Sequence, residues 1–188
     1  IKNEKKFQNY SNHILVTIHR RENWGKNIIE IANALLKLVN RNKNLNILLP
    51  LHPNPKVRDI FLKILGNKER ILLTEPLEYK EFIFALRDCN MVLTDSGGIQ
   101  EEAPSFGKPV LVLRNTTERT EGVEAGTSKL IGTRSDDIVK ETEKIFLNKK
   151  EYNKMSKINN PYGDGNASKK IFEKVIDFLN AKNLSASN

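Results

Sequence analysis

Short apolar runs alternate with segments of helical periodicity along most of the chain. The runs are continuous and rich in β-branched residues, which is typical of strands covered on both faces of a sheet rather than strands with one face in water. This pattern predicts strands at residues 13–18, 45–51, 70–74, 91–95, 109–113 and, more weakly, 128–132.

Helical periodicity fills the intervals between these runs. Residues Ile28, Ile31, Leu35 and Leu38 recur at i, i+3, i+7 and i+10, so they share one face of a helix. The same periodicity predicts further helices at 55–66, 79–89, 136–147 and 167–180. Strands and helices that alternate in this way build a mostly parallel sheet with helices on both faces. We therefore expect a doubly wound, Rossmann-like α/β fold, with residues 1–188 forming a single domain.

Composition places the chain among soluble globular proteins. It has 188 residues, of which 38% are hydrophobic and 29% charged. No apolar run approaches the ~18–20 residues that span a bilayer, and no apolar signal-peptide region follows the first charged residues. The single cysteine, Cys89, excludes an internal disulfide and fits a cytoplasmic protein without membrane contact. Because the chain starts with Ile1 rather than Met, we expect it to be part of a longer protein.

A formal net charge of +8 can serve nucleic acid, a membrane surface or a phosphorylated ligand. The lysines are scattered and no aromatic residues lie between them, which argues against nucleic acid as a partner. His13, His19 and His52 lack the spacing of a zinc site, so we expect no structural metal.

The loops that follow the strands are the candidate sites, because ligands of doubly wound sheets bind at the carboxyl ends of the strands. The first loop places His19, Arg20 and Arg21 just before a helix. These cations suit a phosphorylated ligand, or they pair with nearby acidic residues; both interpretations stay open. Asn23 or Asn27 is a candidate cap for the helix that follows.

Two further loops carry one candidate each. His52 lies in the segment LHPNP, where it contacts a ligand or, as is commoner for a lone histidine, stabilises the turn. Phe82 follows the third strand and could stack on a base, although most phenylalanines at helical spacing belong to the core.

The fourth loop joins a predicted strand to a short acidic helical segment through Ser96, Gly97 and Gly98. Glycines let the backbone approach a ligand closely, and the free N–H groups at the start of a helix favour phosphate. Neither standard glycine-rich nucleotide fingerprint is present. Glu101 and Glu102 suit the first turn of a helix, or one of them accepts hydrogen bonds from ribose hydroxyls. The residues by themselves predict a phosphate-containing ligand and no more.

Several motifs together resemble the carboxyl half of the non-hydrolysing UDP-N-acetylglucosamine 2-epimerases. The motifs are VTIHRREN, LHPNP, LTDSGGIQEEAPSFGKPVLVLRNTTER, EAGT and NPYGDGNAS, and the similarity covers about residues 13–180. The resemblance implies two Rossmann-like domains of the glycosyltransferase-B type, with the UDP-sugar between them. It also implies a homodimer when full length.

The reaction implied by the resemblance interconverts UDP-N-acetylglucosamine (UDP-GlcNAc) and UDP-N-acetylmannosamine (UDP-ManNAc), without a dissociable cofactor. UDP leaves C1 by anti elimination as C2 loses its proton, and UDP then re-adds with the C2 configuration inverted. The carboxyl half mainly holds UDP, whereas the carboxylates that move protons belong to the amino half. We therefore expect this chain alone to bind UDP without epimerising.

The resemblance also assigns residues. The cationic form of His19 would contact the diphosphate and act in catalysis, Glu102 would accept from the ribose, and Phe82 would pack against uracil. The implied UDP site consists of His19, Phe82, Ser96, Gly97, Gly98, Glu102 and Arg119.

Bacterial members of the family bind a second UDP-GlcNAc that activates the enzyme. The resemblance implies that Arg20 and His52 are the residues this half would contribute to that allosteric site. Two residues depart from the family pattern. Leu77 replaces a glutamine of the uracil-side loop, which removes a side-chain contact. Thr120 replaces the proline after TTER, which we expect to loosen the loop that holds Arg119.

Three alternative functions stay open at this stage. The chain could be the nucleotide-binding half of a glycosyltransferase-B-type transferase, or of a hydrolysing 2-epimerase that releases free N-acetylmannosamine. A non-enzymatic module that binds nucleic acid through its positive charge is the third, and it predicts strongly salt-dependent binding.

Overall fold

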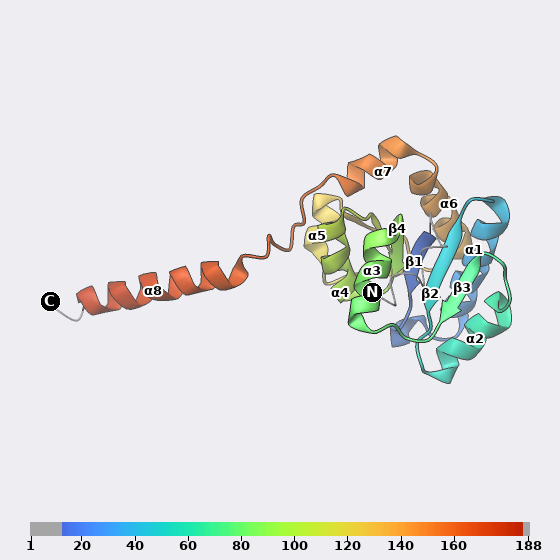
Figure 1. The fold of residues 1–188 in the computed structure, drawn as a ribbon, viewed down its shortest axis with the longest axis horizontal. Coiled ribbons are helices and arrows are strands. Elements are labelled where there is room, and N and C mark those ends of the chain that lie inside the picture. The colour runs from blue at the N-terminus through green and yellow to red at the C-terminus, as the bar shows by residue number, and fades with distance from the viewer. Residues whose placement is uncertain (1–12, 186–188) are drawn as a thin grey trace.

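Six parallel strands form one sheet in the order β3-β2-β1-β4-β5-β6 (Figure 1). The structure is a computed structural model that describes residues 13–185. Each of the six predicted strands is confirmed, with ends that differ by one or two residues. The strands are β1 (His13–Thr17), β2 (Asn46–Pro50), β3 (Ile71–Thr74), β4 (Met91–Thr94), β5 (Val110–Val112) and β6 (Ser128–Leu130).

All five predicted helices are also confirmed, as α1, α2, α3, α6 and α8, and the short acidic segment after β4 forms α4. Two helices, α5 and α7, lie in segments where the apolar pattern predicts none. The helices are α1 (Lys26–Arg41), α2 (Pro55–Leu65), α3 (Tyr79–Asp88), α4 (Gly97–Glu102), α5 (Thr120–Ala125), α6 (Ser135–Phe146), α7 (Lys149–Ser156) and α8 (Ala167–Ser185), with 3-10 helices η2 (Arg21–Asn23) and η3 (Ala103–Phe106).

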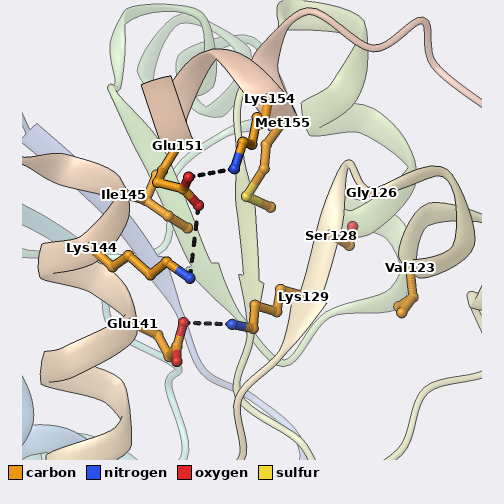
Figure 2. A pocket seen from close by; sticks show the side chains of 10 residues that line it. All are labelled: Val123, Gly126, Ser128, Lys129, Glu141, Lys144, Ile145, Glu151, Lys154 and Met155. Atoms are coloured by element: carbon orange, nitrogen blue, oxygen red, sulfur yellow. Dashed lines mark hydrogen bonds and ion pairs between the residues drawn. The ribbon is translucent and has the colours of Figure 1, made fainter. Parts of the chain in front are cut away.

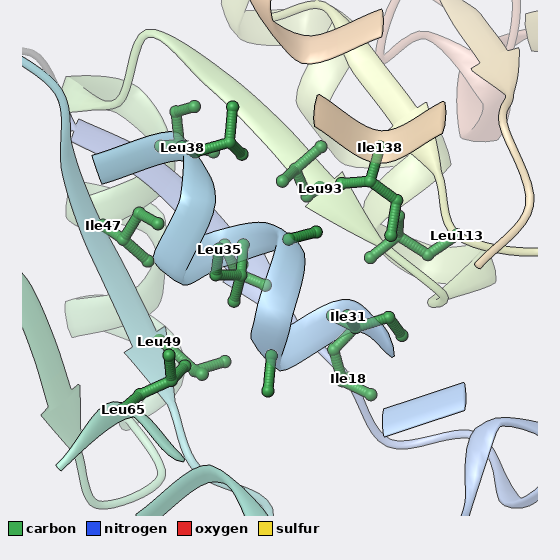
Figure 3. Packing of buried hydrophobic residues seen from close by; sticks show 14 of the residues in the cluster. Ile18, Ile31, Leu35, Leu38, Ile47, Leu49, Leu65, Leu93, Leu113 and Ile138 are labelled. Atoms are coloured by element: carbon green, nitrogen blue, oxygen red, sulfur yellow. The ribbon is translucent and has the colours of Figure 1, made fainter. Parts of the chain in front are cut away.

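Helices cover both faces of the sheet, as expected for a doubly wound fold. Successive strand residues point to opposite faces, so Ile14 and Val16 pack with α1, α2 and α6, whereas Leu15 packs with α3 and η3. Figure 3 shows part of the larger cluster, to which Leu35 of α1 and Ile138 of α6 belong. Full burial of such side chains contributes about 1.5–3 kcal/mol each, which explains the continuous apolar runs of the sequence.

Helix α8 stands away from the rest of the molecule (Figure 1). Every described side chain of α8 is exposed, including Ile171, Phe172 and Phe178. The prediction that residues 1–188 form one domain stays a prediction. Across residues 13–185, no helix combines the length and apolar character needed to cross a membrane.

Candidate functional site

The strand order brings two of the predicted loops, those after β1 and β4, to one edge of the sheet together with the loop after β5. β1 lies beside β4, with Thr17 opposite Thr94, and β4 lies beside β5, with Thr94 opposite Val112. Strands β2 and β3 are added on one side of β1, whereas β4, β5 and β6 are added on the other side. Ligands of such sheets bind at the point where the strand order reverses, here between β1 and β4. His19 after β1, Ser96 after β4 and the loop that follows β5 therefore meet at the same carboxyl edge.

Asp95 connects the loop after β1 to the loop after β4. Its side chain is fully buried. The backbone N–H groups of His19 and Arg20 donate to its carboxylate over 3.1 and 2.9 Å, and the Asn23 side-chain amide donates over 2.9 Å. The imidazole Nδ1 of His19 lies 3.1 Å from Asp95 Oδ1. Burial alone would raise the pKa of Asp95, but the donors from His19, Arg20 and Asn23 together hold it below its usual value.

Asn23 and Asn27 do not cap α1, contrary to the sequence-based expectation. The N-cap is Gly25, with φ of +81°, and no side chain bonds to the cap. Asn23 instead donates to Asp95 and to the carbonyl of Leu113, and Asn27 donates to the carbonyl of Glu22. The amide of Asn23 thus joins three loops at the centre of the site.

Arg119 lies directly against the glycine turn. A Cβ added to Gly97 would lie 3.3 Å from Cζ of Arg119, so a side chain at this position would crowd the guanidinium. A Cβ added to Gly98 would meet nothing closer than the Ser96 hydroxyl at 4.0 Å, so this second glycine faces open space. The Arg119 Nε donates to Glu101 over 2.6 Å, which shows that Glu101 holds this cation in place.

The loop that carries Arg119 is held by several hydrogen bonds. The Thr117 hydroxyl donates to the buried side chain of Gln100 over 2.8 Å and accepts from the Arg119 N–H over 3.1 Å. The Tyr162 hydroxyl donates to the Arg119 carbonyl over 3.2 Å and accepts from the Gly122 N–H over 2.9 Å. These bonds anchor the loop on both sides of Thr120, the residue that we expected to loosen it.

A segment near the C-terminus runs over α4 and η3. The side-chain amide of Asn160 donates to the Glu101 carbonyl over 2.9 Å and to the Ser105 hydroxyl over 2.7 Å. Its side-chain oxygen accepts from the Tyr162 N–H over 3.0 Å. The motif NPYGDGNAS therefore stabilises the site through Asn160, which bonds to α4 and η3, and through Tyr162, which bonds to the loop of Arg119.

A buried arginine fastens the loops after β1 and β5 to each other. The Arg114 side chain is only 4% exposed, donates from Nε to Glu22 over 2.5 Å, and forms a bidentate pair with Glu118 at 2.8 and 3.1 Å. The hydrogen bonds to Glu118 and then Glu22 raise the pKa of Arg114, and Arg114 in turn lowers the pKa of Glu118 to about 2. This cation is fully engaged by carboxylates, and its role is to position the loops.

The remaining predicted residues occupy varied surroundings. Glu102 is half-buried and pairs with no side chain among residues 13–185; burial, and then the nearby Glu101, raise its pKa. Phe82 is half-buried and packs at the margin of the second hydrophobic cluster together with Leu77; its contact with uracil stays a prediction. Arg20 is half-buried, with Nη1 3.8 Å from Glu118. The His52 ring accepts from the Asn54 N–H over 3.1 Å, which ties it to its own turn.

A cavity of about 290 Å³ lies elsewhere, at the edge strand β6, between the end of α5, the second half of α6 and α7 (Figure 2). Each charged side chain that lines it is paired: Lys129 with Glu141 at 2.6 Å, and Lys144 and Lys154 with Glu151 at 3.7 and 2.5 Å. The cavity shares no residue with the predicted site, and its ion pairs join α6 and α7 to each other and α6 to β6.

Sequence reasoning missed Asp95, Arg114, Gln100, Asn160 and Tyr162 as parts of the site. Each is a polar residue that touches a loop distant in sequence, so its partner is unknown until the strand order is known. Within residues 13–185, no group of three or more His, Cys, Asp or Glu side chains is arranged to hold a metal ion.

Comparison with known proteins matches this chain to one family. The family model described as UDP-N-acetylglucosamine 2-epimerase matches residues 1–176. The UDP-N-acetylglucosamine 2-epimerase of Campylobacter jejuni is 46% identical over 184 residues, which are 98% of this chain and 48% of the relative. The chain thus spans about half the length of the curated relatives it matches.

Solved structures agree with the sequence comparison. The UDP-GlcNAc 2-epimerase of Neisseria meningitidis, solved with UDP-GlcNAc bound, has a TM-score of 0.88 at 44% identity, covering 94% of this chain and 48% of that one. The C-terminal domain of a group 1 glycosyl transferase from Francisella tularensis shares the fold alone, with a TM-score of 0.64 at 15% identity, covering 85% of this chain and 87% of that domain. The predicted α/β fold is confirmed as half of the epimerase structures, and the chain belongs to the UDP-N-acetylglucosamine 2-epimerase family.

Proposed function

We propose that this chain is the UDP-binding, carboxyl half of an enzyme that interconverts UDP-GlcNAc and UDP-ManNAc. The observation that carries the proposal is the Arg119 guanidinium lying against Gly97, at the edge where His19 and Ser96 also lie. A cation beside a glycine turn, where backbone N–H groups are within reach of a ligand, suits a diphosphate. The Neisseria meningitidis relative, which carries UDP-GlcNAc, supports the choice of nucleotide.

Glu102 supports the ribose end of the proposed site. Its carboxylate is half-buried and unpaired within the described part of the chain, whereas the neighbouring Glu101 is engaged by Arg119. A carboxylate accepts hydrogen bonds but cannot donate them, so the vicinal hydroxyls of a ribose are suitable partners. Burial raises the pKa of Glu102, and hydrogen bonds from the ribose hydroxyls would lower it again.

The proposed mechanism assigns different steps of the reaction to this carboxyl half and to the amino half of the enzyme. As UDP leaves C1, negative charge grows on the diphosphate, and Arg119 with protonated His19 would stabilise it. A proton is then delivered to C2 from the opposite face as UDP re-adds at C1, which inverts the C2 configuration. His19 and Arg119 are thus the residues of this chain that would touch the leaving group, and the chain needs no cofactor for this role.

The carboxylates at this edge explain why the chain alone should not epimerise. Asp95 accepts from four donors, Glu101 holds Arg119, and Glu22 and Glu118 hold Arg114. These four groups are committed to positioning, and Glu102, the unpaired carboxylate of this edge, is the one proposed to accept from the ribose hydroxyls, so none of the five is assigned to remove the proton from C2. The proton-transferring carboxylates would come from the amino half of the enzyme, and the complete enzyme would act in the cytoplasm as a homodimer.

Calorimetric titration of the chain with UDP, with CDP as the control, tests the proposal. We expect saturable binding that prefers UDP at moderate salt. Binding that is equal for the two nucleotides, or that disappears as salt rises in the steep manner of nucleic-acid-binding proteins, would contradict it.

A second experiment tests the division of labour. The purified chain is incubated with UDP-GlcNAc, and proton NMR monitors UDP-ManNAc and free N-acetylmannosamine. We expect neither product from the chain alone. The appearance of UDP-ManNAc would refute the assignment of proton transfer to the other half, and free N-acetylmannosamine from the complete protein would identify a hydrolysing epimerase instead.

A further inference from the structure

The contact between Asp95 and His19 bears on which nitrogen of the histidine faces a ligand. The imidazole Nδ1 lies 3.1 Å from the buried Asp95 Oδ1, while the His19 side chain as a whole is 44% exposed. One nitrogen is therefore turned inward to a carboxylate, and the other, Nε2, lies on the exposed side of the ring.

Every group that faces the Asp95 carboxylate is a donor. Two are backbone N–H groups, of His19 and Arg20, and a third is the amide NH₂ of Asn23. These donors hold the pKa of Asp95 below its usual range despite burial, so the carboxylate is ionised at neutral pH. An ionised carboxylate only accepts, and an imidazole nitrogen beside it must carry a proton to form a hydrogen bond.

We propose that Asp95 is a positioning residue that keeps the proton of neutral His19 on Nδ1, so that Nε2 is the nitrogen presented to the diphosphate. The inference rests on the proposed function for the identity of the ligand. In the neutral ring Nε2 is then an acceptor, which repels a phosphate oxygen. Only the doubly protonated ring donates from Nε2, so the diphosphate binds together with a proton, and Asp95 is the counter-ion of the resulting imidazolium.

The same carboxylate aligns the ring with the rest of the site. Because it also receives the N–H groups of His19 and Arg20, it fixes the backbone that carries the imidazole as well as the ring itself. Asp95 directly precedes Ser96 and the glycine turn, so one side chain sets the position of His19 relative to the turn that would hold the phosphates.

Asp95→Asn is the decisive variant, because it keeps the size of the side chain and replaces one acceptor oxygen with an NH₂ group. At the Oδ2 position this NH₂ would face two donors, the Arg20 N–H and the Asn23 NH₂, so it takes the Oδ1 position, where it faces His19 Nδ1. The His19 N–H can then use the remaining oxygen, and the mismatch at Oδ1 is relieved when Nδ1 loses its proton and accepts. We expect the proton of the neutral ring to move to Nε2 in this variant. Nitrogen-15 chemical shifts of the ring report the change, with His19→Gln used to assign the signal among His13, His19 and His52.

Asn23→Ala is the matched control. It removes a donor from the same carboxylate and from the Leu113 carbonyl, but it leaves the imidazole contact in place. If Asp95 only fastened the loop, both variants would lower thermal stability and neither would move the proton. We expect Asn23→Ala to keep the Nδ1–H ring, and Asp95→Asn alone to lose it and to weaken UDP binding by at least about tenfold, as for loss of a charged hydrogen-bond partner.

The nitrogen-15 shifts test this inference and the UDP affinity tests the proposed function. The two tests are independent, because the proton position is measured without ligand. A wild-type chain whose neutral His19 carries its proton on Nε2, or an Asp95→Asn chain with an unchanged ring, overturns the inference. A wild-type chain with the expected ring but no affinity for UDP overturns the proposed function and leaves the proton assignment standing.

Discussion

Two arginines at the carboxyl edge of the sheet are used in different ways. Arg114 is almost fully buried and directs three of its N–H groups to two carboxylates, so its guanidinium is not presented to a ligand in an open site. Arg119 is 37% exposed, holds a single carboxylate through Nε, and lies against the glycine turn. Arginine can pair with a carboxylate along one edge and a phosphate along the other, so Arg119 is the cation available for substrate.

Arg119→Ala should weaken UDP binding to this chain by at least about tenfold, or about 1.4 kcal/mol, because it removes the cation beside Gly97. Titration calorimetry measures the change. Arg41→Ala is the control, since Arg41 forms its ion pair with Glu143 at the opposite end of α1. Equal affinities of the wild-type and Arg119→Ala chains would remove Arg119 from the site.

Glu118 should make stability depend on pH in acid. Its pKa falls from an ordinary 4.5 to about 2, first through the hydrogen bond from Arg114. A lowered pKa means that the contribution to folding is complete above about pH 4.5 and is lost as the pH falls toward about 2. Glu118→Gln should therefore flatten the dependence of the urea midpoint on pH within this window.

The control for this experiment is Glu124→Gln, which removes the same charge from an exposed residue of α5 for which no partner is found among residues 13–185. If Glu124→Gln flattened the acid limb as much as Glu118→Gln, net charge rather than the Arg114 pair would be the cause.

At the scale of elements, the apolar pattern was sufficient to predict the strands and the long helices. It could not predict α7, whose residues are not buried and whose helix depends on the Asn148 cap and on a hydrogen bond from Tyr152 to Asn90. It also missed the role of Asp95, because the hydrogen bond to the His19 N–H spans 76 positions and exists only where β1 meets β4. Candidate site residues could be named from the sequence and stay a prediction, whereas the contacts that orient them depend on the tertiary structure.

Tyr162→Phe should destabilise the segment that supports the site. The variant removes hydrogen bonds to the Arg119 carbonyl and the Gly122 N–H, each worth about 0.5–1.5 kcal/mol, so we expect a loss of about 1–3 kcal/mol in the free energy of unfolding. Urea denaturation measures this loss. Tyr79→Phe, at a 68% exposed position, is the control and should change stability little. The same loss in both variants would contradict the role of Tyr162.

At the scale of the whole molecule, α8 is the element on which we expect the stability of the other elements not to depend. Its apolar side chains face solvent, and an isolated helix of this kind draws little stability from its own backbone. They are Ile171, Phe172, Val175, Ile176, Phe178 and Leu179, with exposures between 39% and 66%. The stability of the sheet and its covering helices should therefore be independent of α8.

Deletion of residues 167–188 tests this independence. We expect the thermal midpoint of the shortened chain to fall by less than about 3 °C, since the ion pair between α8 and the segment just before it, Lys170 with Asp164, is exposed. Differential scanning calorimetry of the two chains makes the comparison. A drop of 8 °C or more, on the order of 2–4 kcal/mol at this chain length, would show that α8 packs against the body.

The position of β1 between β2 and β4 has a consequence for synthesis on the ribosome. One side of β1 pairs with β2, which is synthesised soon after it, but the other side stays unpaired until β4 has been synthesised. Asp95, which follows β4, is 76 residues beyond His19. At roughly 5–20 residues per second, about 4 to 15 s pass while a central apolar strand has an open edge. The nascent chain is therefore most exposed to mispairing in the interval before the candidate site can form, and closure of that edge and assembly of the candidate site are a single late event.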